Sequence, residues 1–132
     1  MCDTPLMILI FAIGAGGAIG AVGRYLLSTQ ISTVLGTQFP WGILMVNGVG
    51  GMLMGAIAQV GTQSLLISQE AKAFLATGIL GGFTTFSAFS LDTALLIQRG
   101  DITSAVLYVA GSVVGSVSAL FAGLYVTRMV MQ

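Results

Sequence analysis

Four long apolar stretches, separated by short polar segments at 28–40, 61–72 and 98–104, dominate the sequence. Each stretch reaches the roughly 20 residues that an α-helix needs to cross the hydrocarbon core of a bilayer. The pattern predicts an all-α membrane protein made of a single four-helix transmembrane domain over residues 1–132. We expect the spans at about 6–27, 41–60, 73–97 and 105–126.

Two local signals refine the ends of these spans. The tripeptide Phe39-Pro40-Trp41 is typical of a helix start, because proline fits the first turn and tryptophan favours the membrane interface. Asp3 stands where a secretory leader carries basic residues, so we expect the first stretch to be a permanent span. An even number of spans predicts both termini on one side of the membrane.

Composition agrees with this pattern. Hydrophobic residues make up 56% of the chain and charged residues only 6%, against about 25% charged in soluble domains. Four Lys/Arg balance four Asp/Glu, so no basic patch is available for nucleic acid. Histidine, the commonest metal ligand, is absent, and with Cys2 as the only cysteine no internal disulfide can form.

The basic residues indicate no preferred orientation in the membrane. Lys72 and Arg128 fall on the side of the termini, and Arg24 and Arg99 fall on the other, whereas orientation normally follows such a bias. A chain without bias can insert both ways and supply two opposed copies for an antiparallel homodimer. The alternative is one orientation set by subtler cues, and the count alone favours neither.

Small residues recur at four-residue spacing in three of the spans. Such stripes let membrane helices approach closely, so we expect packing contacts here before any ligand role. The positions are Gly16 and Gly20, Gly51 and Gly55, and then Gly111, Gly115, Ala119 and Gly123. Four short helices leave little interior for a wide pore, which favours a polar pathway formed in a dimer.

The middle of the third span is predicted to break. Paired glycines followed by paired threonines weaken a helix, and the run reads Gly81-Gly82-Phe83-Thr84-Thr85-Phe86-Ser87. A break frees backbone groups that lipid cannot satisfy, and broken helices in membranes bind ions through such groups. An intact helix with a glycine contact is the alternative, but the composition of the run favours the break.

Two features near the run are expected at membrane depth. Asn47 offers amide donors and a carbonyl acceptor, and an interhelical hydrogen bond fits it as well as a pore contact does. Phe86 and Phe89 share a helix face, and their positive ring edges could contact an anion. Taken without context, packing is the commoner role for such an aromatic pair.

The fourth span carries a ladder of hydroxyls on one face, formed by Tyr108, Ser112 and Ser116. Hydrogen bonding to the preceding helical turn is the alternative role for these groups. Only Arg24 and Asp92, placed near span ends, bring charge to membrane depth. Neutral donors fit the passage of a small anion, which must bind well enough to enter and loosely enough to leave.

The residues described above resemble the fluoride channel family known as Fluc or CrcB. The resemblance covers nearly the whole chain, including Gly23-Arg24-Tyr25, Val46-Asn47 and Gly50-Gly51, and is most specific at the run from Gly81 to Ser87. It implies an antiparallel, dual-topology homodimer with two pores in the bacterial inner membrane. It also implies passive export of fluoride from the cytoplasm.

The resemblance further implies individual site residues. The fluoride pore would comprise Asn47, Phe86, Phe89, Tyr108, Ser112 and Ser116. A structural sodium ion would be held by the backbone carbonyls of Gly81 and Thr84, and we expect Gly81 to need the backbone freedom of glycine. Three positions depart from the family pattern, namely Ala88 for threonine, Asp92 for glutamate and Leu120 for threonine.

Other classes of protein fit the sequence less well. A small dual-topology multidrug or cation transporter is the main alternative, but it would need an embedded carboxylate that the first span lacks. A membrane subunit that only packs against partners would not need a broken helix beside hydroxyls and Asn47. An enzyme is disfavoured, because no nucleophile–base pair, paired carboxylates or metal-ligand set is present.

Overall fold

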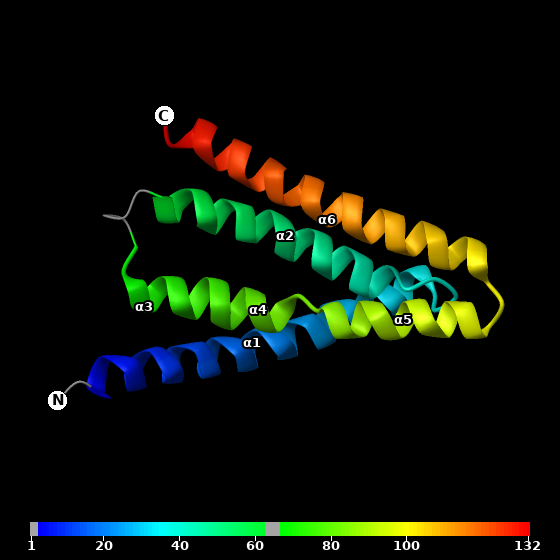
Figure 1. Ribbon diagram of the computed structural model, residues 1–132, viewed down its shortest axis with the longest axis horizontal. Helices are drawn as coiled ribbons and strands as arrows, with labels where there is room; N and C mark the ends of the chain where they lie inside the picture. The colour runs from blue at the N-terminus through cyan, green and yellow to red at the C-terminus, as the bar shows by residue number, and fades with distance from the viewer. Residues whose placement is uncertain (1–2, 63–66) are drawn as a thin grey trace.

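The computed structural model describes residues 3–62 and 67–132, and within these ranges all regular structure is helical (Figure 1). Four segments are long and apolar enough to cross a membrane, which confirms the predicted all-α class. The elements are α1 (Asp3–Leu35), α2 (Trp41–Thr62), α3 (Gln69–Lys72), η1 (Ala73–Leu80), α4 (Gly81–Phe83), α5 (Phe86–Gln98) and α6 (Ile102–Val130).

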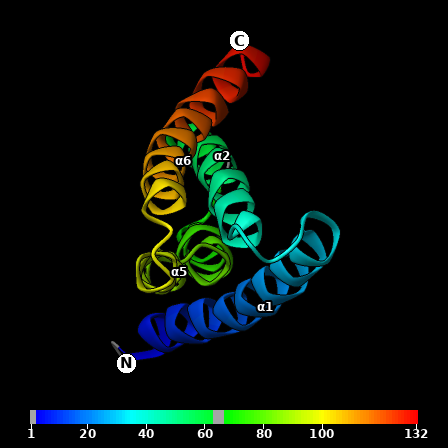
Figure 2. The ribbon, with the colours of Figure 1, turned by 90° about the vertical axis from the view of Figure 1, so that its right-hand side faces the viewer.

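The helices form two packed pairs. Helix α2 lies along α6, and α1 lies along η1 and α4 (Figures 1 and 2). The third span is continuous in direction from α3 through α5, and it joins the two pairs because α5 also contacts α6. The start of α1 and the end of α6 lie at the same end of the molecule, as an even number of spans predicts (Figure 1).

Glycines allow the close contacts within each pair. A Cβ on Gly51 would lie 2.7 Å from the backbone oxygen of Ser116, so α2 and α6 touch there through their backbones. The packing role of the stripes is confirmed at Gly16, Gly20, Gly51, Gly55 and Gly123, where an added Cβ would overlap a neighbouring helix. Gly115 differs, because a Cβ added there would meet nothing within 4 Å in the described part of the chain.

The first helix is longer than the apolar pattern predicts. It continues past Leu27 to Leu35 and ends at Gly36, whose φ of +89° and N–H bond to the Ser32 carbonyl form a left-handed cap. The hydroxyl of Thr33 donates to a backbone carbonyl one turn earlier, so the polar segment remains helical. The predicted helix start at Trp41 is confirmed.

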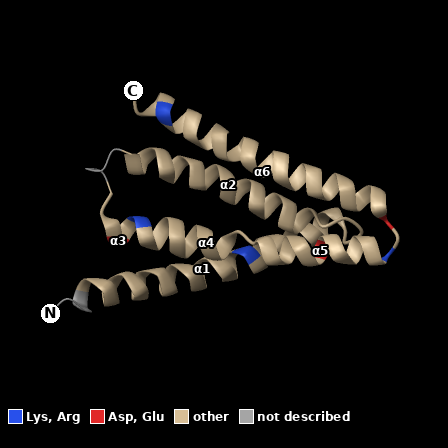
Figure 3. Ribbon diagram, in the orientation of Figure 1, with Lys and Arg blue, Asp and Glu red and all other residues tan. Residues whose placement is uncertain are grey.

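This extension corrects the placement of Arg24. The residue lies inside α1 rather than at its end, and its Nε is buried with no hydrogen-bond partner among the residues that the structure describes. Most other charged residues lie near helix ends (Figure 3).

The turn between α5 and α6 is closed by two residues. Gly100 takes a φ of +77°, which favours glycine, and the Asp101 carboxylate accepts a hydrogen bond of 3.1 Å from the Ser104 N–H. Hydrogen bonds from the side chain and backbone of Ser104 hold the pKa of Asp101 below its usual value. This cap fixes where α6 begins and thus the register of its hydroxyls.

Candidate functional site

The third span breaks between α4 and α5, as the sequence predicts. Thr84 and Thr85 have extended backbones, with φ/ψ of −80°/155° and −152°/127°. The Thr84 hydroxyl donates to the Leu80 carbonyl at 2.9 Å and closes the first half-helix, while the Thr85 hydroxyl accepts from the Ala88 N–H at 3.1 Å and caps the second. Each threonine thus satisfies one end of the break.

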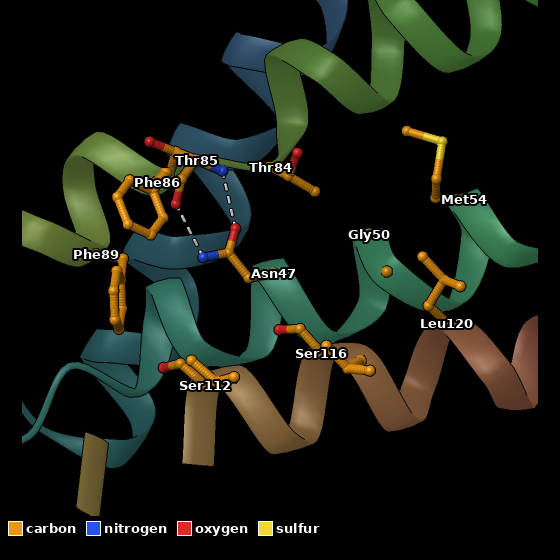
Figure 4. Close-up of a pocket in the computed structure, with 13 residues that line it drawn as sticks. Asn47, Gly50, Met54, Thr84, Thr85, Phe86, Phe89, Ser112, Ser116 and Leu120 are labelled. Carbon is orange, nitrogen blue, oxygen red and sulfur yellow. Dashed lines mark hydrogen bonds between the residues drawn. The ribbon is translucent and has the colours of Figure 1, made fainter. Parts of the chain in front are cut away.

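Asn47 on α2 makes two hydrogen bonds to the backbone of the break (Figure 4). The Thr85 N–H donates to its Oδ1 at 2.8 Å, and its Nδ2 donates to the Thr85 carbonyl at 3.0 Å. The structure therefore gives Asn47 the interhelical role that the sequence left open. A primary amide carries two N–H groups, so this pairing leaves one of them for a ligand.

A cavity of about 430 Å³ lies between the break, α2 and α6. Its lining includes five of the six predicted pore residues, namely Asn47, Phe86, Phe89, Ser112 and Ser116. Figure 4 shows the serines of α6 on the side facing Asn47, with the two phenylalanine rings at one end. Leu120, where the family pattern has a hydroxyl, also lines the cavity.

Ser112 contributes the most distinctive group of this cavity. The residue is only 7% exposed, and its Oγ is buried without a hydrogen-bond partner in residues 3–62 and 67–132. Back-bonding to the preceding turn is therefore not observed for Ser112. A buried hydroxyl without a partner is costly, so this donor is available to a bound ligand.

The two phenylalanines lie side by side at the start of α5. Their ring centroids are 5.3 Å apart with an interplanar angle of 43°. Phe86 is 77% exposed, whereas Phe89 also packs against the Tyr108 ring at 5.4 Å. The exposed ring leaves the cavity open on that side of a single chain.

Tyr108, the sixth predicted pore residue, lies apart from this cavity. It is fully buried against Phe39 and Phe89, and its hydroxyl donates to the Asp92 carboxylate at 3.1 Å. The sequence alone gives Asp92 no role. Tyr108 thus connects the aromatic end of the cavity to an acidic group on α5 rather than offering a free hydroxyl.

The expectation that Gly81 needs glycine's backbone freedom is wrong. Its φ/ψ of −63°/−38° is ordinary helix, and an added Cβ would meet nothing closer than the Ala76 oxygen at 3.7 Å. The constrained position is Gly82, where a Cβ would lie 2.5 Å from the Gly17 oxygen. The tight packing near the break therefore lies at Gly82, where α4 approaches α1 closely, and Gly81 has ordinary helical geometry.

This difference predicts opposite outcomes for neighbouring substitutions. Gly82→Ala should lower the free energy of unfolding by about 1–3 kcal/mol, because the methyl group overlaps backbone of α1 that cannot move aside easily. Gly81→Ala should be nearly neutral and serves as the matched control. Thermal unfolding of both variants in detergent would test this, and equal effects would contradict it.

The break also offers backbone oxygens to a cation. In a continuous helix the Thr85 N–H would donate to the carbonyl of Gly81, four residues earlier, but here it donates to Asn47. Within the described ranges no cluster of His, Cys, Asp or Glu could hold a metal ion. A cation at the break would therefore rely on carbonyl oxygens, which suit hard cations.

These features define a class of protein: a helical membrane protein of four spans, in which a broken span borders a polar cavity of neutral donors. The chain belongs to the CrcB family, since the family model described as "CrcB-like protein, Camphor Resistance (CrcB)" matches residues 11–124. The match confirms the family that the run from Gly81 to Ser87 indicates.

Several relatives are similar to this chain along nearly its full length. A protein of Nitrobacter winogradskyi is 48% identical over 121 residues, covering 92% of this chain and 96% of the relative. One from Rhodospirillum centenum is 49% identical over 122 residues, with 92% and 97% covered. One from Caulobacter vibrioides is 45% identical over 122 residues, with 92% and 96% covered. Each of the three is named "Fluoride-specific ion channel FluC".

Proposed function

We propose that this protein is a fluoride-selective ion channel, not an enzyme, which lets fluoride leave the cytoplasm passively and so reduces its toxicity. Its four spans would form one domain in the bacterial inner membrane. The names and full-length similarity of the relatives support this proposal. The observation that carries it is the buried hydroxyl of Ser112, which finds no hydrogen-bond partner among the described residues and lines the same cavity as Asn47.

The chemistry of the cavity suits a small anion. Fluoride is tightly hydrated, so a selective path must replace its water with close donors. The Ser112 hydroxyl, the second N–H of Asn47 and the positive edges of Phe86 and Phe89 are such donors, and none carries a full charge that would trap the ion. Ser116 continues the hydroxyl face one turn further along α6.

We propose an antiparallel, dual-topology homodimer with two pores as the working form. The open side of the cavity at Phe86 supports this, because a second copy would enclose the ring that one chain leaves exposed. Gly115, around which residues 3–62 and 67–132 leave open space, and the exposed Val113 on α6 offer further surface for such a copy. The near balance of basic residues agrees with insertion in both orientations.

We also propose a structural sodium ion at the break, held by the backbone carbonyls of Gly81 and Thr84. The residues fit this ion, since the Gly81 carbonyl loses its usual helical donor and Thr84 is extended. Sodium would supply positive charge that stabilises backbone carbonyl oxygens left without a hydrogen-bond donor at the break. The Thr84 hydroxyl donates its hydrogen to the Leu80 carbonyl, and the proposed ligand from Thr84 is its backbone carbonyl.

Ion release from liposomes tests the proposed function directly. Vesicles loaded with fluoride or with chloride and containing the purified protein would be followed with ion-selective electrodes. We expect rapid release of fluoride and retention of chloride. Equal release of both anions would contradict selectivity, and proton-coupled uptake of organic cations without fluoride release would favour the multidrug or cation transporter.

A further inference from the structure

The Asn47 side chain pairs with both backbone hydrogen-bonding groups of Thr85, as a neighbouring strand does in a β-sheet. Its Oδ1 accepts from the Thr85 N–H at 2.8 Å and its Nδ2 donates to the Thr85 carbonyl at 3.0 Å, so both backbone groups of one residue are satisfied by one amide. The two residues come from different spans, and Thr85 itself is fully extended. The amide of one span therefore holds the backbone of another in its non-helical conformation.

Without this amide, the Thr85 N–H would need another hydrogen-bond acceptor. Lipid offers no hydrogen bonds, so an unpaired N–H at membrane depth is costly. Rotation of Thr84 and Thr85 into helical conformation would pass the Thr85 N–H to the Gly81 carbonyl, the acceptor of a continuous helix. That change would straighten the third span, use up the Gly81 oxygen and displace Phe86, the residue after Thr85.

The hydrogen bonds of the two threonine hydroxyls do not prevent this straightening. The Thr84 hydroxyl bonds to Leu80 within its own half-helix, and the Thr85 hydroxyl bonds to Ala88 within the next. Both contacts lie on the third span and can persist or be exchanged as it rotates. The side-chain hydrogen bonds that reach the Thr85 backbone from another helix, within the described residues, are the two from Asn47.

We infer that Asn47 is a positioning residue that keeps the third span broken and thereby keeps the Gly81 carbonyl free for a cation. The second half of this inference rests on the proposed sodium site. In this role Asn47 acts on fluoride through the backbone, besides any direct contact made by its second N–H. A residue that only contacts fluoride would affect flux and leave the binding of sodium unchanged.

Three substitutions separate the two roles. Asn47→Leu keeps the approximate shape but removes every hydrogen bond. Asn47→Asp keeps an acceptor for the Thr85 N–H but places a carboxylate in the anion path. Ser112→Ala is the matched control, because Ser112 lines the same cavity without bonding to the break. We would measure two properties of each purified variant. The first is fluoride efflux, and the second is the rise of the unfolding temperature in sodium compared with the same concentration of a large organic cation.

We expect a distinct result for each variant. Asn47→Leu should lose efflux and should need at least roughly tenfold more sodium for the same rise in unfolding temperature, because both hydrogen bonds to Thr85 are lost. Asn47→Asp should lose efflux yet keep the sodium response of the unchanged protein. Ser112→Ala should show reduced efflux with a normal sodium response. A normal sodium response in Asn47→Leu would overturn the inference. Loss of the sodium response in Asn47→Asp would overturn it too, and this second test remains available if the leucine variant does not fold.

A crystal structure of Asn47→Leu decides the positioning role without reference to sodium. Thr85 in helical conformation, bonded to Gly81, would support it, and an unchanged break would overturn it. If the unchanged protein shows no sodium response, the sodium site is wrong and this structure alone decides the role of Asn47. If the unchanged protein releases no fluoride, the proposed function fails, while the sodium and structural results still decide the inference.

Discussion

Phe86→Ile is expected to reduce fluoride efflux roughly tenfold or more, which corresponds to about 1.4 kcal/mol on the barrier, while leaving the protein folded and its elution profile unchanged. Isoleucine keeps apolar bulk but has no ring edge with positive potential. Phe86 is 77% exposed in the single chain, so the exchange removes little packing there. Efflux from liposomes and size-exclusion chromatography measure the two properties separately.

Phe89→Ile should reduce efflux similarly but should also lower stability. Its ring packs against Tyr108 with centroids 5.4 Å apart, and loss of that contact adds a packing cost of under about 1.5 kcal/mol. Phe11→Ile is a suitable control, since Phe11 is exposed on α1 and does not line the cavity. Normal efflux in both Phe86→Ile and Phe89→Ile would contradict a role for the ring edges.

The break and the helix contacts could be predicted because their signals are local. Paired glycines and threonines within seven residues weaken one stretch of helix, whatever packs against it. The glycine stripes follow from a four-residue period that needs no knowledge of the partner helix. The structure confirms the break at Thr84–Thr85 and the helix contact where Gly51 meets Ser116.

The length of α1 is harder to predict, because hydropathy reports contact with lipid and not the end of a helix. The segment after Leu27 is polar, yet its hydroxyls bond to the preceding turn and the helix persists. The better signal is Gly36, the next glycine able to take a positive φ. Hydropathy alone places Arg24 at a span end, although it lies within the helix.

The remaining differences arise from contacts between distant parts of the chain. Gly81 and Gly82 are equivalent in the sequence, and only the approach of Gly17 on α1 makes Gly82 the constrained one. The sequence places the Tyr108 hydroxyl in a ladder on α6, but in the structure it donates to Asp92 on α5 at 3.1 Å. Asn47 likewise could be placed at depth, but its pairing with Thr85 depends on how two spans meet.

Dual topology predicts that a chain forced into one orientation is inactive alone and becomes active when a copy in the opposite orientation is present. The chain has only four basic residues, and they are nearly balanced between the two ends of the molecule. Two added lysines at one end should therefore decide orientation, since Lys and Arg are retained on the cytoplasmic side. Gln69→Lys with Glu70→Lys would bias one copy, and Gln38→Lys with Gln98→Lys would bias the other.

All four positions are exposed at opposite ends of the molecule, so neither double variant should disturb the packing. Cells lacking their own fluoride exporter would express either copy alone or both together, with reporters of orientation on the C-terminus. We expect fluoride resistance only on co-expression, because an antiparallel pair needs both orientations, and signals of both orientations from the unchanged chain. Full resistance from a copy whose reporters show one orientation would mean that the protein works without an inverted partner.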